Sequence, residues 1–116
     1  MSEQLTENAE VICQRIRLSG VVQGVGFRPL VWRLAHELKL SGWVRNDAQG
    51  VEIEVCGPRE AVELLLKRLH QDAPPLARID AITSRFTDSV AVSDDFYILD
   101  SRGGRAATMI GQDTAI

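Results

Sequence analysis

Two periodicities alternate along this chain, and their order limits the possible folds more than any other feature. Period-two alternation, with Ile16 and Leu18 on one side, predicts a half-buried strand over residues 11–18. Apolar residues with helical spacing follow: Phe27, Leu30, Val31, Leu34, Ala35 and Leu38. This spacing predicts an amphipathic helix of about three turns. Pro29 lies near its start, where a missing backbone N–H costs little.

The second half of the chain continues the alternation. Residues 42–46 and 51–56 have strand patterns and are joined through residues 47–50, which predicts a hairpin. A second helix then begins after Gly57-Pro58, and its apolar stripe consists of Ala61, Val62, Leu65, Leu66 and Leu69. The last strand candidates are residues 79–86 and 96–99, of which one could be an extra edge strand. This order predicts an α+β, ferredoxin-like βαββαβ sandwich with two helices on one face of an antiparallel sheet.

In such a sandwich the first and third strands are neighbours. The polar side of the first strand carries Arg15 and Arg17. The polar side of the third strand carries Glu52 and Glu54. We therefore expect the arginines to face the glutamates on the side of the sheet without helices. Such pairs contribute only about 0.2–1 kcal/mol each, so they favour the register more than the stability.

The two ends of the chain lack these patterns. Residues 1–10 are polar and acidic, which predicts a disordered N-terminal arm before a folded domain over residues 11–100. Residues 101–116 are mostly small and polar and show no period, which predicts a linker. The N-terminus has no secretory signal pattern, and no apolar run approaches the roughly 20 residues of a membrane span. We therefore expect a cytoplasmic protein.

The composition is that of one ordinary globular domain, with 116 residues, 45% hydrophobic and 25% charged. Thirteen Lys and Arg against 16 Asp and Glu give a net charge of −3, which argues against a nucleic-acid module with a basic field. Cys13, Cys56, His36 and His70 show no metal-ligand spacing, so we expect no metal site. The two cysteines lie near the ends of neighbouring predicted strands, but in a reducing cytosol a disulfide is not expected.

The most informative motif runs from Gly20 to Arg28, at the junction between a strand and a helix. Its three glycines allow backbone N–H groups to turn inward, and the helix N-terminus adds free amides and a positive dipole end. The planar guanidinium of Arg28 matches phosphate geometry at two points. We predict a phosphate-binding loop made of Val22, Gln23, Gly24, Val25, Gly26, Phe27 and Arg28. The glycines alone would also fit a plain strand-to-helix turn, because the spacing matches neither a Walker A loop nor a dinucleotide fingerprint.

A second motif favours the phosphate-binding interpretation. The run from Gly20 to Arg28 is followed by Gly-Trp-Val-Arg-Asn-Asp at 42–47 and Gly-Val-Glu at 50–52. In order and spacing, this combination resembles the acylphosphatase family over roughly residues 16–99. The resemblance implies a ferredoxin-like fold and hydrolysis of acyl phosphates without a metal. It also implies that Arg28 binds the phosphate and that Asn46 orients the attacking water.

Two further segments narrow the resemblance. Phe-Arg-Pro-Leu-Val-Trp at 27–32 and Pro-Pro-Leu-Ala-Arg-Ile-Asp at 74–80 resemble the N-terminal acylphosphatase domain of the HypF carbamoyltransferases of [NiFe]-hydrogenase maturation. This resemblance implies hydrolysis of carbamoyl phosphate here. Downstream domains, with ATP and zinc, would then pass the carbamoyl group to a maturation partner protein, as the precursor of the cyanide ligand. Residues 101–116 resemble the segment before the family's zinc-finger region, so we expect a fragment of a longer protein that holds no cofactor itself.

Two other functions remain open on the sequence. A free-standing acylphosphatase would be expected to end soon after the 96–99 strand, and this chain continues beyond it. A non-catalytic ferredoxin-like RNA-binding module would need sheet-face aromatics and positive charge, and a chain with three Phe, one Tyr and a net charge of −3 offers little of either.

Three other residues have predictable surroundings. Trp32 and Trp43 lie off the predicted apolar faces, which fits either edge packing or contact with a neighbouring domain. Arg45 flanks Asn46, and strand alternation favours the opposite face of the sheet for Arg45.

Overall fold

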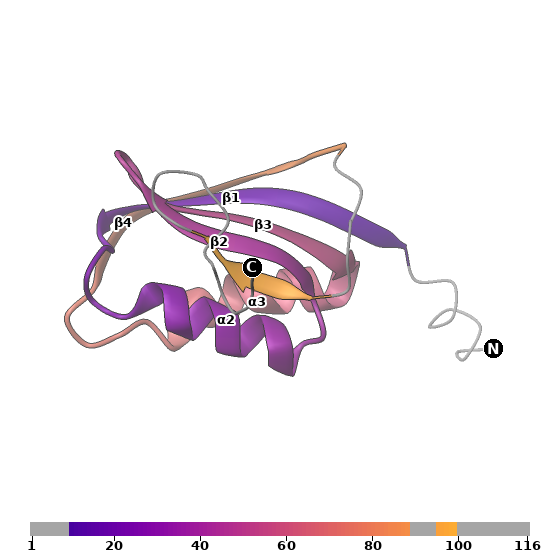
Figure 1. Cartoon of the computed structure of the whole chain (residues 1–116), viewed down its shortest axis with the longest axis horizontal. Helices are drawn as coiled ribbons and strands as arrows, with labels where there is room; N and C mark the ends of the chain where they lie inside the picture. Colours follow the sequence, from indigo (N-terminus) through magenta and orange to yellow (C-terminus); the bar gives the residue numbers. More distant parts are fainter. Residues whose placement is uncertain (1–9, 89–94, 100–116) are drawn as a thin grey trace, which may run out of the picture.

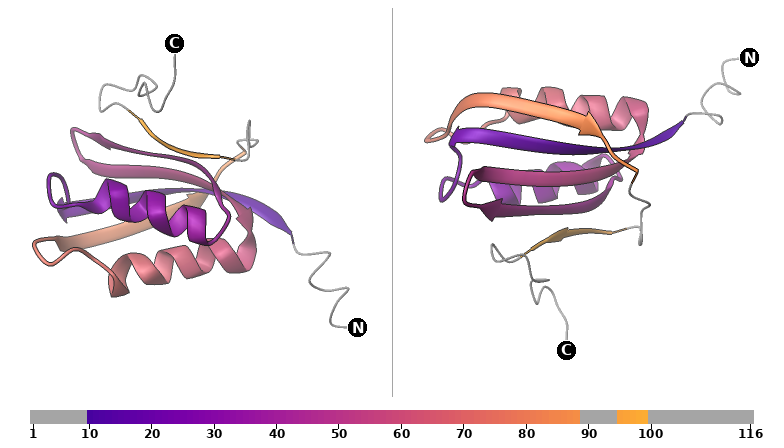
Figure 2. Two further views of the ribbon diagram at one scale, coloured as in Figure 1. Left: turned by 60° about the horizontal axis from the view of Figure 1, so that its bottom comes forward. Right: turned by 90° about the horizontal axis from the view of Figure 1, so that it is seen from above.

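The computed structural model describes residues 10–88 and 95–99 of the chain. The fold has two layers: one β-sheet, and two helices that both cover the same face of the sheet (Figures 1 and 2). The elements are β1 (Val11–Val21), α2 (Phe27–Glu37), β2 (Ser41–Asp47), β3 (Gly50–Pro58), α3 (Arg59–Gln71), β4 (Arg78–Phe86) and β5 (Phe96–Ile98). The predicted arm at 1–10, except Glu10, and the predicted linker at 101–116 lie outside the described residues.

The strand order in the sheet is β4-β1-β3-β2-β5. Strands β1 to β4 pair antiparallel with their neighbours, which confirms the predicted ferredoxin-like βαββαβ fold. β5 differs from the prediction of an antiparallel sheet, because it pairs parallel to β2 and makes the sheet mixed. Phe96 is only 3% exposed, and Leu99 N–H donates to the Val44 carbonyl at 2.8 Å. Burial of the Phe96 ring and this backbone pairing hold β5 at the edge far from β4.

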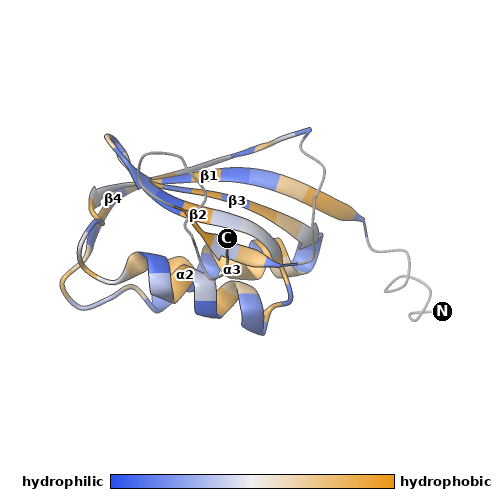
Figure 3. Cartoon of the chain, in the orientation of Figure 1, coloured by the Kyte–Doolittle hydropathy of each residue, from blue (hydrophilic) through white to orange (hydrophobic). Residues whose placement is uncertain are grey.

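The hydrophobic core lies between the sheet and the two helices. Alternate residues of β1 and β3 point into it, and polar and apolar residues interleave along the strands in Figure 3. The largest fully buried side chains are Phe27, Ile16, Leu18, Leu34, Ile53, Leu65, Leu69, Val22, Val31, Val44, Val51 and Val55. Burial of each aliphatic or aromatic side chain of this size contributes about 1.5–3 kcal/mol. None of the helices in the described residues is long and apolar enough to cross a membrane.

The face of the sheet opposite the helices, here called the open face, carries the predicted charge pairs. Arg15 lies opposite Glu54 in the β1–β3 register and donates hydrogen bonds to it, while its Nη1 donates to Glu52 Oε2 at 3.0 Å. Arg45 Nη2 donates to Glu52 Oε1 at 2.8 Å, so Arg45 lies on the open face as alternation predicted. Burial raises the pKa of Glu52, but the hydrogen bonds from Arg45 and Arg15 outweigh it and hold that pKa below its ordinary value.

The two tryptophans lie in different surroundings. Trp43 packs between two cations on the open face, with the guanidinium carbons of Arg15 and Arg45 at 5.0 and 5.2 Å from its ring centroid. Trp32 is exposed on α2 and stacks on His36, with the ring centroids 3.9 Å apart. The ring of Trp43 is therefore part of the charged network of the open face.

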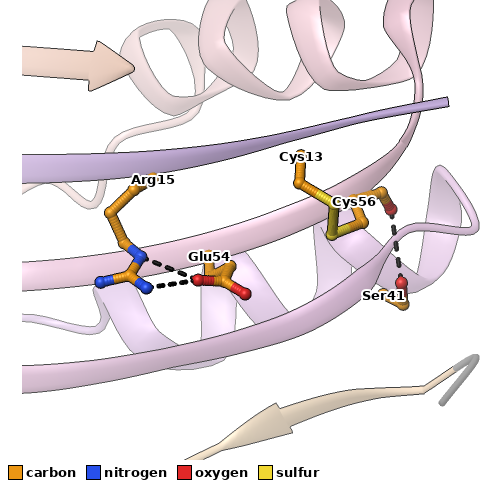
Figure 4. The surroundings of a disulfide bond; sticks show 5 residues. All are labelled: Cys13, Arg15, Ser41, Glu54 and Cys56. Atoms are coloured by element: carbon orange, nitrogen blue, oxygen red, sulfur yellow. Dashed lines mark hydrogen bonds and ion pairs between the residues drawn. A yellow bond between two sulfur atoms is a disulfide. The ribbon is translucent and has the colours of Figure 1, made fainter. Parts of the chain in front are cut away.

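The prediction that the cysteines stay unbonded was wrong. Cys13 and Cys56 form a disulfide on the open face, between β1 and β3 (Figure 4). The β1–β3 register places the two residues directly opposite each other, with a Cα–Cα distance of 4.1 Å. The predicted strands placed the two cysteines near each other, but a disulfide across antiparallel strands also requires them to lie directly opposite, and that register is seen only in the structure.

Candidate active site

The predicted phosphate-binding loop, residues 22–28, connects the end of β1 to the start of α2. Gly24 and Gly26 have φ values of 73° and 103°, in the left-handed region that other residues rarely adopt, so the loop conformation requires glycine at both. Gly26 is the N-cap of α2, and no side chain caps this end or places an acidic group in the first turn. The first amides of α2 are therefore available to an anion, which the helix dipole also favours.

The seven residues predicted as one loop have different roles in the structure. Val22 and Phe27 are each 1% exposed, so their side chains belong to the core and hold the two ends of the loop. They can offer a ligand only their backbone. Gln23, described below, uses its side chain to bind the neighbouring hairpin.

Arg28 occupies the second position of α2 and is half-buried. Seven of the nine arginines within residues 10–88 form ion pairs with carboxylates, while Arg28 and Arg85 form none. A cation at the N-terminus of a helix is unfavourably placed with respect to the dipole. An arginine without an ion pair, in the first turn of a helix whose amides are uncapped, favours an anion at this position.

Asn46 lies near the end of β2, on the side of the sheet that faces the helices. It shares this face with Val44, and it pairs with Val51, which in turn pairs with Leu18 of β1. The Oδ1 atom of Asn46 is buried and has no hydrogen-bond partner among the residues that the structure describes. Buried polar atoms in proteins nearly always have a partner, so this unsatisfied oxygen indicates a position for a water or a ligand.

The side chain of Gln23 joins the loop to the β2–β3 hairpin. Its Nε2 donates to the backbone carbonyls of Asp47 and Gly50, the latter at 2.8 Å. The loop that carries Arg28 and the strand end that carries Asn46 therefore lie at the same end of the sheet, on the left of Figure 1. The sequence identified Gln23 as part of the loop but did not indicate this contact, because its two partners lie more than 20 residues away.

On the open face, the same hairpin is held by a second contact, which differs from the predicted pairing of Arg17 with the glutamates of β3. Arg17 donates from Nη1 and Nη2 to Asp47 Oδ1 and Oδ2, at 2.9 and 2.7 Å. Asp47 Oδ1 also accepts the backbone N–H of Gln49 at 2.8 Å. The hydrogen bond from Arg17 is the largest influence on Asp47 and lowers its pKa to about 2. The pair is therefore charged throughout the neutral pH range.

Comparison with known proteins agrees with this geometry. The sequence model of the family described as Acylphosphatase matches residues 14–98. The chain belongs to the acylphosphatase family. Among curated relatives, it is 37% identical to the acylphosphatase of Salinibacter ruber over 83 residues, which cover 71% of this chain and 86% of that protein. The crystal structure of acylphosphatase from Bacillus subtilis matches with a TM-score of 0.69 and 33% identity, covering 77% of this chain and 98% of the other.

Similarity to much longer proteins is greater still. The chain is 52% identical to the carbamoyltransferase HypF2 of Cupriavidus necator over 111 residues, or 94% of this chain and 14% of that protein. The crystal structure of a full-length HypF in its phosphate- and nucleotide-bound form matches with a TM-score of 0.75 and 35% identity, over 83% of this chain and 13% of the other. This acylphosphatase-like domain is therefore similar to the N-terminal region of HypF proteins, and it spans about a seventh of the length of this HypF2 relative.

Proposed function

We propose that this domain hydrolyses acyl phosphates, with carbamoyl phosphate as the substrate, as part of a HypF-type carbamoyltransferase. The observation that carries the proposal is the unpaired Arg28 beside the uncapped N-terminus of α2. This cation lies on a loop that Gln23 joins to the hairpin carrying Asn46. Family membership supports the reaction class, and the 52% identity to HypF2 supports the larger context.

Arg28 and the loop amides bind the phosphoryl group. Phosphoryl transfer through a loose transition state depends mainly on positioning and on stabilising charge at the phosphoryl oxygens. The guanidinium of Arg28 binds two of these oxygens, and the amides at the start of α2 bind the same group. Loss of one such preorganised donor typically lowers the rate by about 10²–10³.

Asn46 orients the water that attacks phosphorus. Its Oδ1 has no partner in residues 10–88 or 95–99, and an amide can accept and donate hydrogen bonds without itself titrating. The leaving group is a carboxylate, or carbamate when the substrate is carbamoyl phosphate, and it departs without needing a proton. The nearest acidic side chain along β2, Asp47, is bound to Arg17 on the open face and is not required as a base.

The HypF context supplies the rest of the reaction sequence. Domains downstream in a longer chain, with ATP and zinc, would use the carbamate released here and pass the carbamoyl group to a maturation partner protein. The 94% coverage of this chain in the alignment with HypF2 supports this assignment. A free-standing acylphosphatase is the second candidate, supported by 37% identity to the Salinibacter ruber enzyme over most of that enzyme's length.

An RNA-binding function has less support. Ferredoxin-like RNA-binding modules stack bases on exposed aromatics of the sheet. On the open face of this sheet Trp43 lies between Arg15 and Arg45, and these arginines are bound to Glu52 and Glu54. The carboxylates would repel a phosphate backbone.

The test is phosphate release by the purified domain from carbamoyl phosphate and acetyl phosphate. The wild-type domain should hydrolyse both, with the higher kcat/KM for carbamoyl phosphate if the HypF assignment is correct. Arg33→Ala is a matched control, because Arg33 is an exposed arginine of α2 that pairs only weakly with Glu37 at 3.8 Å. Hydrolysis by Arg28→Ala at the rate of the wild type and of Arg33→Ala would contradict the assignment of the site.

A further inference from the structure

The position of Asn46 is set by its backbone, not by contacts of its own oxygen. Within the described part of the chain its Oδ1 has no hydrogen-bond partner, and the next residue, Asp47, ends β2. The placement of the side chain that would orient water therefore depends on whatever holds this strand end. Two side chains hold it, one from the phosphate-binding loop and one from the open face.

The contact on the open face is a two-point ion pair. Arg17 of β1 reaches diagonally past β3 to both carboxylate oxygens of Asp47, at 2.9 and 2.7 Å. Glu52, which lies opposite Arg17 in the register, is 3.7 Å away and is the weaker partner. Asp47 also accepts the N–H of Gln49 within the turn, so a single carboxylate links β1 to the tip of the hairpin.

The contact from the phosphate-binding loop also involves Asp47, through its backbone carbonyl. Gln23 donates one hydrogen bond to the carbonyl of Asp47 and one to that of Gly50, the residues at the two ends of the turn. An amide with two donors can bind both carbonyls at once, which a carboxylate or a shorter side chain at position 23 cannot do. Gln23 therefore links the loop directly to both ends of the hairpin turn.

We propose that Gln23, Arg17 and Asp47 are positioning residues, which set the separation between the phosphate bound at Arg28 and the water held by Asn46. The inference rests on the proposed function and deepens it, because none of the three side chains needs to touch the substrate. Misplacement of a reacting group by about 1 Å can lower a rate about 100-fold. Loss of either contact should therefore lower kcat by a larger factor than the accompanying loss of folding stability alone would explain.

The first test compares Asp47→Ala with Glu54→Ala. Both changes remove a carboxylate bound by an arginine of β1 on the open face, but only Asp47 is next to Asn46. We expect Asp47→Ala to lower kcat about tenfold or more, with the inhibition constant for inorganic phosphate within about twofold of wild type. Glu54→Ala should leave both constants near wild type. Asp47→Asn keeps the acceptor for Gln49 but loses the charge and one of the two oxygens that Arg17 binds, so it should restore only part of kcat.

The second test compares Gln23→Ala with Gln71→Ala, a change of an exposed glutamine at the end of α3. Gln23→Ala releases the loop from the hairpin, so we expect kcat to fall about tenfold or more and phosphate binding to weaken several-fold. Gln23→Glu should resemble Gln23→Ala, because a carboxylate cannot donate to the two carbonyls. Gln71→Ala should match the wild type.

A purely structural role would give a different result. The melting temperatures of Asp47→Ala and Glu54→Ala should be similar. Gln23→Ala, which changes no neighbour of Asn46 in the sequence, should shift the side-chain amide resonances of Asn46 in a ¹⁵N correlation spectrum, and Gln71→Ala should not. The inference would be overturned if Asp47→Ala kept the kcat of Glu54→Ala, or if Gln23→Ala left the Asn46 resonances unmoved. Absence of turnover in the wild type would instead refute the proposed function, and the resonances and the phosphate affinity would still test the positioning.

Discussion

Reduction of the Cys13–Cys56 disulfide should lower the free energy of unfolding of the domain by about 2–4 kcal/mol. The magnitude follows from the loop that the bond closes, since the two cysteines are 43 residues apart in the sequence. The chain-entropy account gives about 4 kcal/mol for a loop of that length, and measured effects are typically about 2–4 kcal/mol. With a urea slope of about 1.5 kcal/mol/M, a loss of 3 kcal/mol lowers the midpoint by about 2 M.

Activity should respond differently from stability. The disulfide lies at the end of the sheet where β1 begins and β3 ends, on the right of Figure 1, whereas Asn46 lies beside the start of β3. Hydrolysis of acyl phosphate at 25 °C should therefore be unchanged by reduction, as long as the reduced domain remains folded. The disulfide stabilises the scaffold without touching the candidate site.

The assay is urea unfolding followed by tryptophan fluorescence, with and without a phosphine reductant, alongside titration of free thiols. The double variant Cys13→Ser/Cys56→Ser is the control, because it should unfold near the midpoint of the reduced wild type and show no response to the reductant. A midpoint that moves by less than about 0.3 M on reduction would refute the entropic reasoning. Two free thiols in the untreated protein would refute the pairing itself.

The remaining predictions concern the site and its charges. Arg28→Ala, and Arg28→Lys nearly as strongly, should abolish hydrolysis and phosphate binding, because an ammonium group cannot bind two oxygens as a guanidinium does. Asn46→Ala should lower kcat with phosphate affinity within a few-fold, and equal loss of phosphate binding in both variants would contradict the division of roles. Arg17 lowers the pKa of Asp47 from 3.8 to about 2, so the pair contributes stability above pH 4 that is lost as the pH falls through 2. This contribution is at most about 2.5 kcal/mol. Urea midpoints at pH 2 and pH 6 should therefore differ less in Asp47→Asn than in wild type. Turnover should be nearly flat between about pH 5 and 8 and unaffected by EDTA, and a rate limb near the histidine pKa would indicate a different mechanism.

Much of this architecture follows from local patterns in the sequence. Alternation along β1 and β3 assigned Arg15 and Glu54 to one face and Ile16 and Ile53 to the other, because successive side chains of a strand point to opposite sides. Helical spacing from Phe27 onward and the strand-helix order were enough for the βαββαβ fold. The same alternation separated Arg45 from the face of Asn46.

The motif residues could also be found from the sequence, because glycine requirements and a helix start are local properties. Gly24 and Gly26 have the left-handed conformations that a tight strand-to-helix loop needs. Their spacing, with Arg28 and Asn46, was sufficient for the family resemblance, and the sequence model of the family matches the same region.

The partners of individual side chains were decided only by the tertiary structure. The disulfide between Cys13 and Cys56 depends on the β1–β3 register, and a shift by one residue would send the two sulfur atoms to opposite faces. The pairing of Arg17 with Asp47, past its register partner Glu52, depends on how three twisted strands lie side by side. Periodicity determines which face a residue occupies, but the contacts that hold Asn46 in place join segments distant in the sequence, and only their packing brings them together.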